Sequence, residues 1–149
     1  MAVRPACQSG RTTGGLGSAM RFTVDRLDHL VVSVRDLEVS ASWFQRVLGM
    51  EREEYGRNNR TALKFGGQKI NLRPYGAEGW TTAEDALPGT NDLCFTTALN
   101  SVDVIEHLEK CGVRVTEGPV ARLGALGPVT SVYCHDPDGN LIEIASYQG

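Results

Sequence analysis

The chain repeats one pattern of predicted elements, and this repeat is the feature that most restricts its fold. A strand-like run, a helical run and three more strand-like runs occur once before and once after a linker over residues 76–89. The helical runs end at Gly49 and Gly112, which lie 63 positions apart and both suit a helix C-terminal stop. The sequence therefore predicts two βαβββ modules, over about residues 24–76 and 89–147.

The helical run of the first module has both a start signal and an apolar face. Asp36 is a suitable N-cap residue, and Leu37, Ala41, Phe44 and Leu48 recur at spacings of four, three and four. This spacing places the four apolar side chains on one side of a helix. We expect that side to pack against a sheet.

The second module carries the same order of signals. Ser101 is the expected N-cap of its helix, residues 113–117 the next strand, and residues 118–128 a Gly/Pro-rich loop. Strands over 130–134 and 140–146 are joined by an Asp-Pro-Asp-Gly sequence, which is strong turn chemistry.

Together the modules predict an α+β fold. Eight strands would form a curled sheet around a cavity, with one helix per module on the outer face. Residues 21–149 would make this one domain, preceded by a disordered extension over residues 1–20. Met20 is the expected natural start, although the acid-poor, Arg-containing extension also resembles an organellar transit peptide.

Composition excludes several classes of partner. A net charge of −3 without a Lys/Arg cluster argues against nucleic-acid binding, and no run is apolar enough to cross a membrane. The four cysteines have no CxxC spacing, which is typical of free thiols in a reducing compartment such as the cytoplasm. A small-molecule substrate is the expected partner.

The register of the repeat brings four positions together. The 63-residue offset relates His29 to Asp92 on the first strands, and an offset of 70 relates Arg73 to Glu143 on the last strands. Side chains alternate along a strand, so these groups can face the cavity while their apolar neighbours pack beneath the helices. One imidazole and two carboxylates, from His29, Asp92 and Glu143, suit a divalent Ni, Co, Zn, Mn or Fe ion.

Each of these residues also has an ordinary structural explanation. His29 could be a satisfied polar residue near a strand start, Asp92 could cap a turn, and Glu143 could face solvent. Only the repeat groups them into a candidate site.

Several segments resemble the vicinal oxygen chelate superfamily, which includes glyoxalase I, fosfomycin-resistance, bleomycin-resistance and extradiol dioxygenase proteins. They are residues 28–34, 43–50 and 136–143. Residues 65–72, 117–120 and 124–128 are most similar to the small glyoxalase domain-containing branch. The resemblance implies one cavity between two modules, a divalent metal, and His29 and Glu143 as ligands. Glu143 could also move protons.

Two positions depart from the family pattern. Glyoxalase I has a histidine where this chain has Asp92, and the position of Arg73 is Glu or Gln there and His in the similar branch. A guanidinium cannot ligate a metal. Arg73 could enter the cavity and replace the charge of the ion, or point outward and leave the ion to His29, Asp92 and Glu143.

These alternatives give three functional hypotheses. The first is a metal-dependent glyoxalase-like lyase or related enzyme acting on a substrate with adjacent oxygens, with Glu143 as ligand and catalytic residue. The second is a metal-free protein that sequesters a small molecule, with Arg73 and Arg122 as substrate-binding residues. An extradiol dioxygenase is a third, weaker hypothesis. Modules of this superfamily pair within or between chains, so a homodimer is one expectation.

Overall fold

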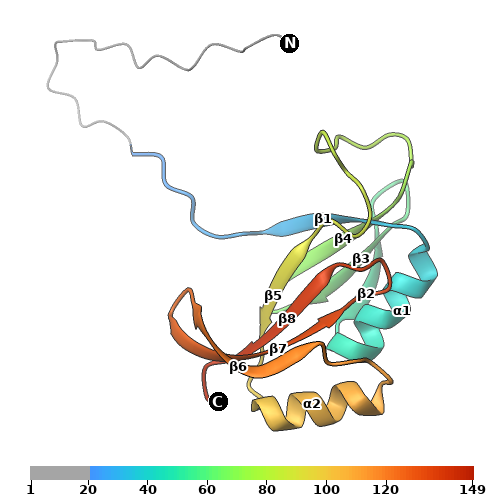
Figure 1. Ribbon diagram of the computed structural model, residues 1–149. Coiled ribbons are helices and arrows are strands. Elements are labelled where there is room, and N and C mark those ends of the chain that lie inside the picture. Colours follow the sequence, from blue (N-terminus) through green and yellow to red (C-terminus); the bar gives the residue numbers. More distant parts are fainter. Residues whose placement is uncertain (1–20) are drawn as a thin grey trace, which may run out of the picture.

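The repeat seen in the sequence is a repeat of structure (Figure 1). The structure is a computed structural model and describes residues 21–149; the expected extension over residues 1–20 lies outside the described part. The first module contains β1 (His29–Val34), α1 (Leu37–Leu48), β2 (Glu51–Tyr55), β3 (Arg60–Phe65) and β4 (Gln68–Pro74). The second contains β5 (Asp92–Thr96), α2 (Ser101–Lys110), β6 (Glu117–Gly124), β7 (Gly127–His135) and β8 (Leu141–Ser146).

Each module forms its own four-stranded sheet. The strand order is β1-β4-β3-β2 in the first sheet and β5-β8-β7-β6 in the second. In both sheets the first and last strands of the module pair in parallel, and the other neighbours pair antiparallel. The α+β class with two βαβββ modules is confirmed, and the eight curled strands are divided between two sheets rather than joined in one.

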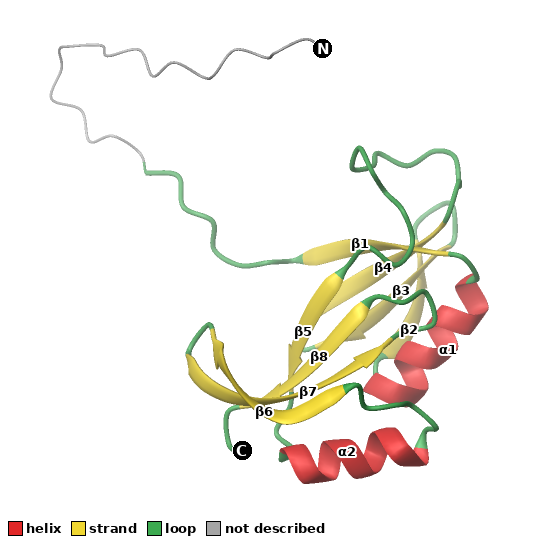
Figure 2. Ribbon diagram, in the orientation of Figure 1, coloured by secondary structure: helices red, strands yellow, loops and turns green. Residues whose placement is uncertain are grey.

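The helices cover one face of each sheet, as Figure 2 shows. Asp36 caps α1 by accepting a hydrogen bond from the Val39 amide, and Gly49 ends it in the left-handed conformation with φ 65°. Buried α1 side chains, among them Phe44 and Val47, join one core that includes strands of both sheets. Within residues 21–149 no helix is long and apolar enough to cross a membrane.

Three details of the second module differ from the expectation. Residues 113–116, expected to be strand, form no strand, and the next strand begins only at Glu117. The α2 cap is Asn100, which accepts from the Asp103 amide, and Ser101 is already the first helical residue. The segment expected as a loop over residues 118–128 is instead mostly strand, because β6 pairs with β7 up to Gly124. Strand β6 lies at the edge of its sheet, where proline and an irregular register after Glu117 are tolerated.

Polar contacts also join the two modules. The buried Asp138 carboxylate, in the β7–β8 turn, accepts hydrogen bonds from the Arg35 amide at 2.9 Å and the Ser40 hydroxyl at 3.1 Å. The Phe65 and Phe95 rings meet edge to face, with centroids 5.3 Å apart. The hydrogen bonds of Asp138 hold the β7–β8 turn against the start of α1, and the two rings join β3 to β5.

The opposite face of each sheet carries no helix among the described residues, and we call it the helix-free face. Alternation puts His29, Val31 and Ser33 of β1 on this face, because Leu30, Val32 and Val34 belong to the core. The register then adds Lys69, Asn71 and Arg73 of β4, and Asp92, Cys94 and Glu143 on the second sheet. All four positions singled out by the repeat therefore lie on helix-free faces.

Candidate functional site

Arg73 points into the helix-free face of the first sheet. It lies beside Ser33 on the neighbouring strand, and its guanidinium donates a 2.8 Å hydrogen bond to the Ser33 hydroxyl. The residue is only 6% exposed. Among the described residues no carboxylate lies within ion-pair distance of it. A buried cation without a counter-charge is costly, so this site favours an anion.

The loop between β4 and β5 covers one side of Arg73. The Trp80 ring in this loop lies 3.7 Å from the Arg60 guanidinium carbon and 5.7 Å from that of Arg73. Arg60 also donates a 2.8 Å hydrogen bond to the Gly79 carbonyl. Cation–π contacts of this kind hold an aromatic side chain against a charged surface.

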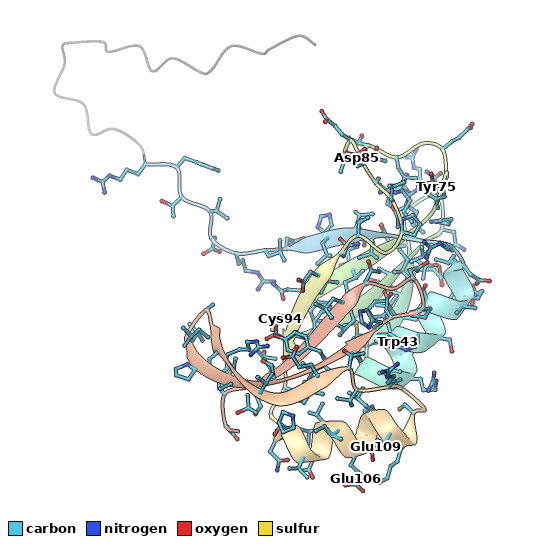
Figure 3. All side chains as sticks on the ribbon, in the orientation of Figure 1. Trp43, Tyr75, Asp85, Cys94, Glu106 and Glu109 are labelled. Carbon is cyan, nitrogen blue, oxygen red and sulfur yellow. The ribbon has the colours of Figure 1, made fainter. Side chains whose placement is uncertain are left out.

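Between this loop and β4 is a hollow of about 300 Å³ that Arg73 lines. Glu84 and Asp85 stand on its rim and are both exposed. Figure 3 shows Asp85 at the outer end of the loop. Arg73 therefore borders a space large enough for a small molecule.

Asn71 occupies the centre of the same face, two residues before Arg73. Its side chain is flanked by Val31 on β1 and Ala62 on β3. The Oδ1 atom of Asn71 is buried and has no hydrogen-bond partner in the described structure, the sole such side-chain atom found there. An orphaned buried acceptor is rare in folded proteins and calls for a specific explanation.

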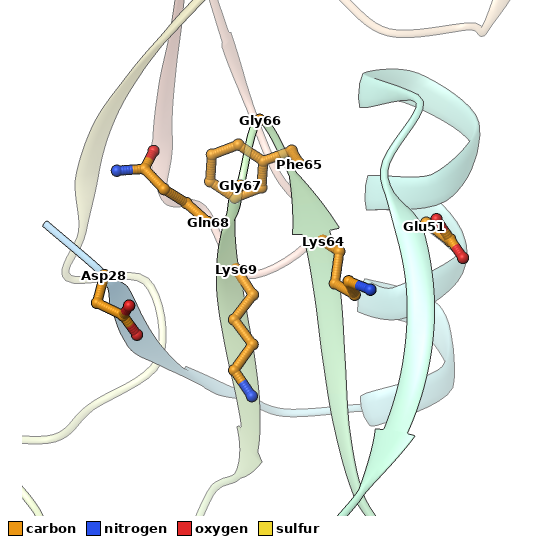
Figure 4. Close-up of a pocket in the computed structure, with 8 residues that line it drawn as sticks. All are labelled: Asp28, Glu51, Lys64, Phe65, Gly66, Gly67, Gln68 and Lys69. Carbon is orange, nitrogen blue, oxygen red and sulfur yellow. The ribbon is translucent and has the colours of Figure 1, made fainter.

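Lys69 spans this face. Its ammonium lies 3.7 Å from the centre of the Tyr55 ring, which is two strands away on β2. Figure 4 shows the Lys69 side chain lying along β4 rather than outward. Strand β3 lies between β4 and β2, and its Ala62 is completely buried. A hollow of about 390 Å³ lies at the β3–β4 turn, and Figure 4 draws the residues that line it.

His29 lies at the start of β1, on the same face. Its Nδ1 atom is 2.8 Å from the Asp28 carboxylate, and its side chain is 46% exposed. The pKa of Asp28 is lowered, chiefly by this hydrogen bond. A carboxylate at Nδ1 fixes the orientation of the ring and leaves Nε2 free.

Glu143 lies on the helix-free face of the second sheet. Its Oε2 accepts a 2.7 Å hydrogen bond from the Ser131 hydroxyl, and Tyr133 is its cross-strand neighbour. Cys94 is the neighbour on the other side. Burial, together with the nearby charges of Glu143 and Asp92 and a hydrogen bond to Glu143, raises the pKa of Cys94 to about 11. Asp92 itself is exposed.

Arg122 belongs to the second sheet and differs from Arg73 in its surroundings. It donates hydrogen bonds to the Tyr133 hydroxyl at 3.1 Å and to the Glu117 carboxylate at 2.8 Å. Its charge therefore already has a partner. The structure does not bring it together with Arg73 in a contact.

The residues of one chain do not fit a metal centre. In the described range no three His, Cys, Asp or Glu side chains come close enough to hold an ion. His29 and Glu143 lie on different sheets, and the fourth position of the repeat is filled by the buried Arg73. The repeat predicted which strand faces carry these side chains. It did not predict that within one chain the two faces belong to different sheets, with His29 on one and Glu143 on the other.

Sequence reasoning missed Ser33 and Asn71. Both have a signal that could have found them, because alternation from His29 and Arg73 places them on the same face. The missing partner of Asn71 could not be predicted, because it depends on which side chains reach across the sheet.

Two modules of this topology, each with a polar helix-free face, define the class of paired βαβββ proteins. The chain belongs to the Glyoxalase/Bleomycin resistance protein/Dioxygenase superfamily, whose family model matches residues 26–144. The resemblance noted in the sequence is thereby confirmed.

Several known proteins are more than 40% identical to this chain. The chain is 42% identical over 129 residues to virulence protein STM3117 of Salmonella typhimurium, covering 87% of this chain and 89% of that protein. It is 44% identical over 128 residues to the glyoxalase domain-containing protein RDO1 of Mycosarcoma maydis, covering 86% and 72%. The solved integron cassette protein VCH_CASS1 from the mobile metagenome of V. cholerae is 44% identical, with a TM-score of 0.82 and coverage of 85% and 98%.

More distant structures share the fold alone. Lactoylglutathione lyase from Agrobacterium tumefaciens is 18% identical with a TM-score of 0.65, over 85% of this chain and 96% of that one. TnmS3, an antibiotic binding protein from Streptomyces sp. CB03234, is 19% identical with a TM-score of 0.66, over 85% and 98%. The same fold thus serves an enzyme and a binding protein.

Proposed function

We propose that this chain is a small-molecule binding protein of the superfamily, and that its ligand is an organic anion held by Arg73. The observation that carries the proposal is the buried guanidinium, which has Ser33 as its hydrogen-bond partner and no carboxylate beside it among residues 21–149. Most of its N–H donors are left for a ligand. A carboxylate or phosphonate matches the planar fork of an arginine.

The surroundings support an anion as well. The helix-free face of the first sheet carries Arg60, Lys64, Lys69 and Arg73 against Glu51 and Glu53. Although Glu84 and Asp85 also line the hollow beside Arg73, the strands themselves carry two more cations than carboxylates, which gives the sheet surface a positive potential. Such a potential attracts small anions from solution.

The test is a titration of the full chain with butanoate, followed by NMR chemical shifts. Arg73→Gln removes the cation with little change in length, and we expect it to weaken binding at least tenfold. Arg57→Gln is the matched control, because Arg57 is exposed in the β2–β3 turn and carries the same charge. Equal affinity in wild type and Arg73→Gln would overturn the proposal.

A metal-dependent enzyme, glyoxalase-like or otherwise acting on adjacent oxygens, is the second candidate. The observation that favours it is the contact between Asp28 and His29, which leaves Nε2 of the imidazole free as in metal-binding histidines. A site with His29, Asp92 and Glu143 would need two chains. The opposite charges of the faces support such a homodimer, since Asp92, Glu117 and Glu143 outnumber Arg122 on the second sheet.

Metal analysis separates the two candidates. Stoichiometric Ni, Co, Zn, Mn or Fe in protein purified without chelators would favour the enzyme, and oxygen consumption with catechols would favour a dioxygenase. Metal bound by Arg73→His but not by wild type would mark a lost metal site, as the binding proposal requires. Size-exclusion chromatography with light scattering measures whether the chain dimerises.

We also propose a cytoplasmic setting for the protein. It is supported by the state of Cys94, Cys111 and Cys134, which are all free thiols.

A further inference from the structure

We infer that the ligand of Arg73 carries, besides its anionic group, a hydrogen-bond donor such as a hydroxyl or an amine, and that the Oδ1 atom of Asn71 accepts from it. This inference rests on the proposed function and specifies the class of ligand. It places a hydroxy acid or an amino acid of three or four carbons on the helix-free face of the first sheet.

The first support is that the side-chain oxygen of Asn71 lacks a hydrogen-bond donor. The residue is 6% exposed, and its Oδ1 is buried without a partner in the described structure. Leaving such an acceptor unpaired is destabilising, and the loss is recovered when a donor arrives. On either side of the amide stand Val31 and Ala62, which have no side-chain donor to offer.

The second support is the position of Asn71 relative to Arg73. Both side chains lie on the same face of β4, two residues apart, and neighbours of this kind are separated by roughly 6.6 Å along a strand. A chain of three or four carbons spans that distance. One molecule can therefore place an oxyanion at Arg73 and a donor at Asn71.

The third support is the cover over Asn71. The Lys69 ammonium lies 3.7 Å from the centre of the Tyr55 ring, and the strand register places Asn71 and Ala62 in the row between these two residues. Both side chains are half-buried, and a single cation–π contact of this kind is weaker than an ion pair between opposite charges. An arriving anion can attract the Lys69 ammonium away from Tyr55, and this movement opens Asn71 to the donor of the ligand.

The test compares 4-hydroxybutanoate with butanoate, which differ by the donor alone. In NMR titrations of the full chain we expect the hydroxy acid to bind about tenfold more tightly, the effect of one well-formed hydrogen bond. Asn71→Leu keeps the side-chain volume and removes the acceptor. In that variant we expect the ratio of the two affinities to fall to about one.

A second variant protects the test against misfolding. Ala62→Ser places a hydroxyl opposite Asn71, where it can donate to Oδ1 from within the protein. We expect it to reduce the preference as well. If both acids bind equally to wild type but depend on Arg73, the anion site stands and the donor inference is wrong. If neither acid binds, the proposed function fails and the inference fails with it.

Discussion

Replacing Asp138 by alanine tests how the second module is attached to the first. Its carboxylate is 3% exposed and accepts from the Arg35 amide and the Ser40 hydroxyl, and Ser40 is itself buried. Removing it leaves two donors unpaired at about 1–3 kcal/mol each. The Arg35 guanidinium is 63% exposed, so its 3.4 Å ion pair with the carboxylate contributes little.

We therefore expect Asp138→Ala to lower the free energy of unfolding by about 3 kcal/mol, or the melting temperature by roughly 12 °C. Asp138→Asn retains one acceptor and should cost about 1 kcal/mol. Urea unfolding followed by circular dichroism measures both, with Asp25→Ala as an exposed control. A loss below about 1 kcal/mol for Asp138→Ala would refute the reasoning, because it would mean that water replaces the carboxylate at no cost.

Two further experiments test the backbone at Gly89 and the ionisation of the Cys94 thiol. Gly89→Ala would place a Cβ 2.4 Å from the Asp138 carbonyl oxygen at a φ of +77°, whereas Gly76→Ala has a φ of +79° and open space. Both pay for the left-handed backbone, about 1 kcal/mol, but Gly89→Ala should unfold at lower urea by at least a further 1 kcal/mol. Equal losses of unfolding free energy in the two variants would show that the backbone around Gly89 can shift to accommodate the added Cβ. For Cys94, whose pKa is raised to about 11, alkylation by iodoacetamide should accelerate about tenfold per pH unit between pH 8 and 10. Glu143→Gln removes a nearby negative charge, lowers that pKa and should speed alkylation about threefold or more at pH 8, as peptide mass spectrometry can measure. An unchanged rate would place the Glu143 charge too far from the thiol to matter.

Local sequence signals were enough to predict the order of the helices and strands. Asp36 and Gly49 determine the ends of α1 through their own side chain and backbone, without help from distant residues. The repeat then gave the module order and both helix-free faces. The strand over 118–124 was missed because its pairing with β7 outweighs the turn preference of Gly118 and Pro119.

The candidate site could be predicted only in part. The sequence left two orientations open for Arg73. Its orientation depends on contacts with Ser33 on β1 and with Trp80 in the β4–β5 loop, which the sequence does not reveal. The separation of His29 from Glu143 depends on how two sheets share a core. Likewise, the role of Asp138 follows from its contact with Arg35, 103 residues earlier in the chain.

The alternation of side chains has a consequence for how this protein can change over time. On β4, Ile70 and Leu72 support the core, while Lys69, Asn71 and Arg73 between them face outward. Substitutions in the second set change the helix-free face, whereas the apolar contacts of the core depend on the first set. A change of charge at position 73 therefore alters the polar face of the sheet and leaves the apolar side of β4 in place.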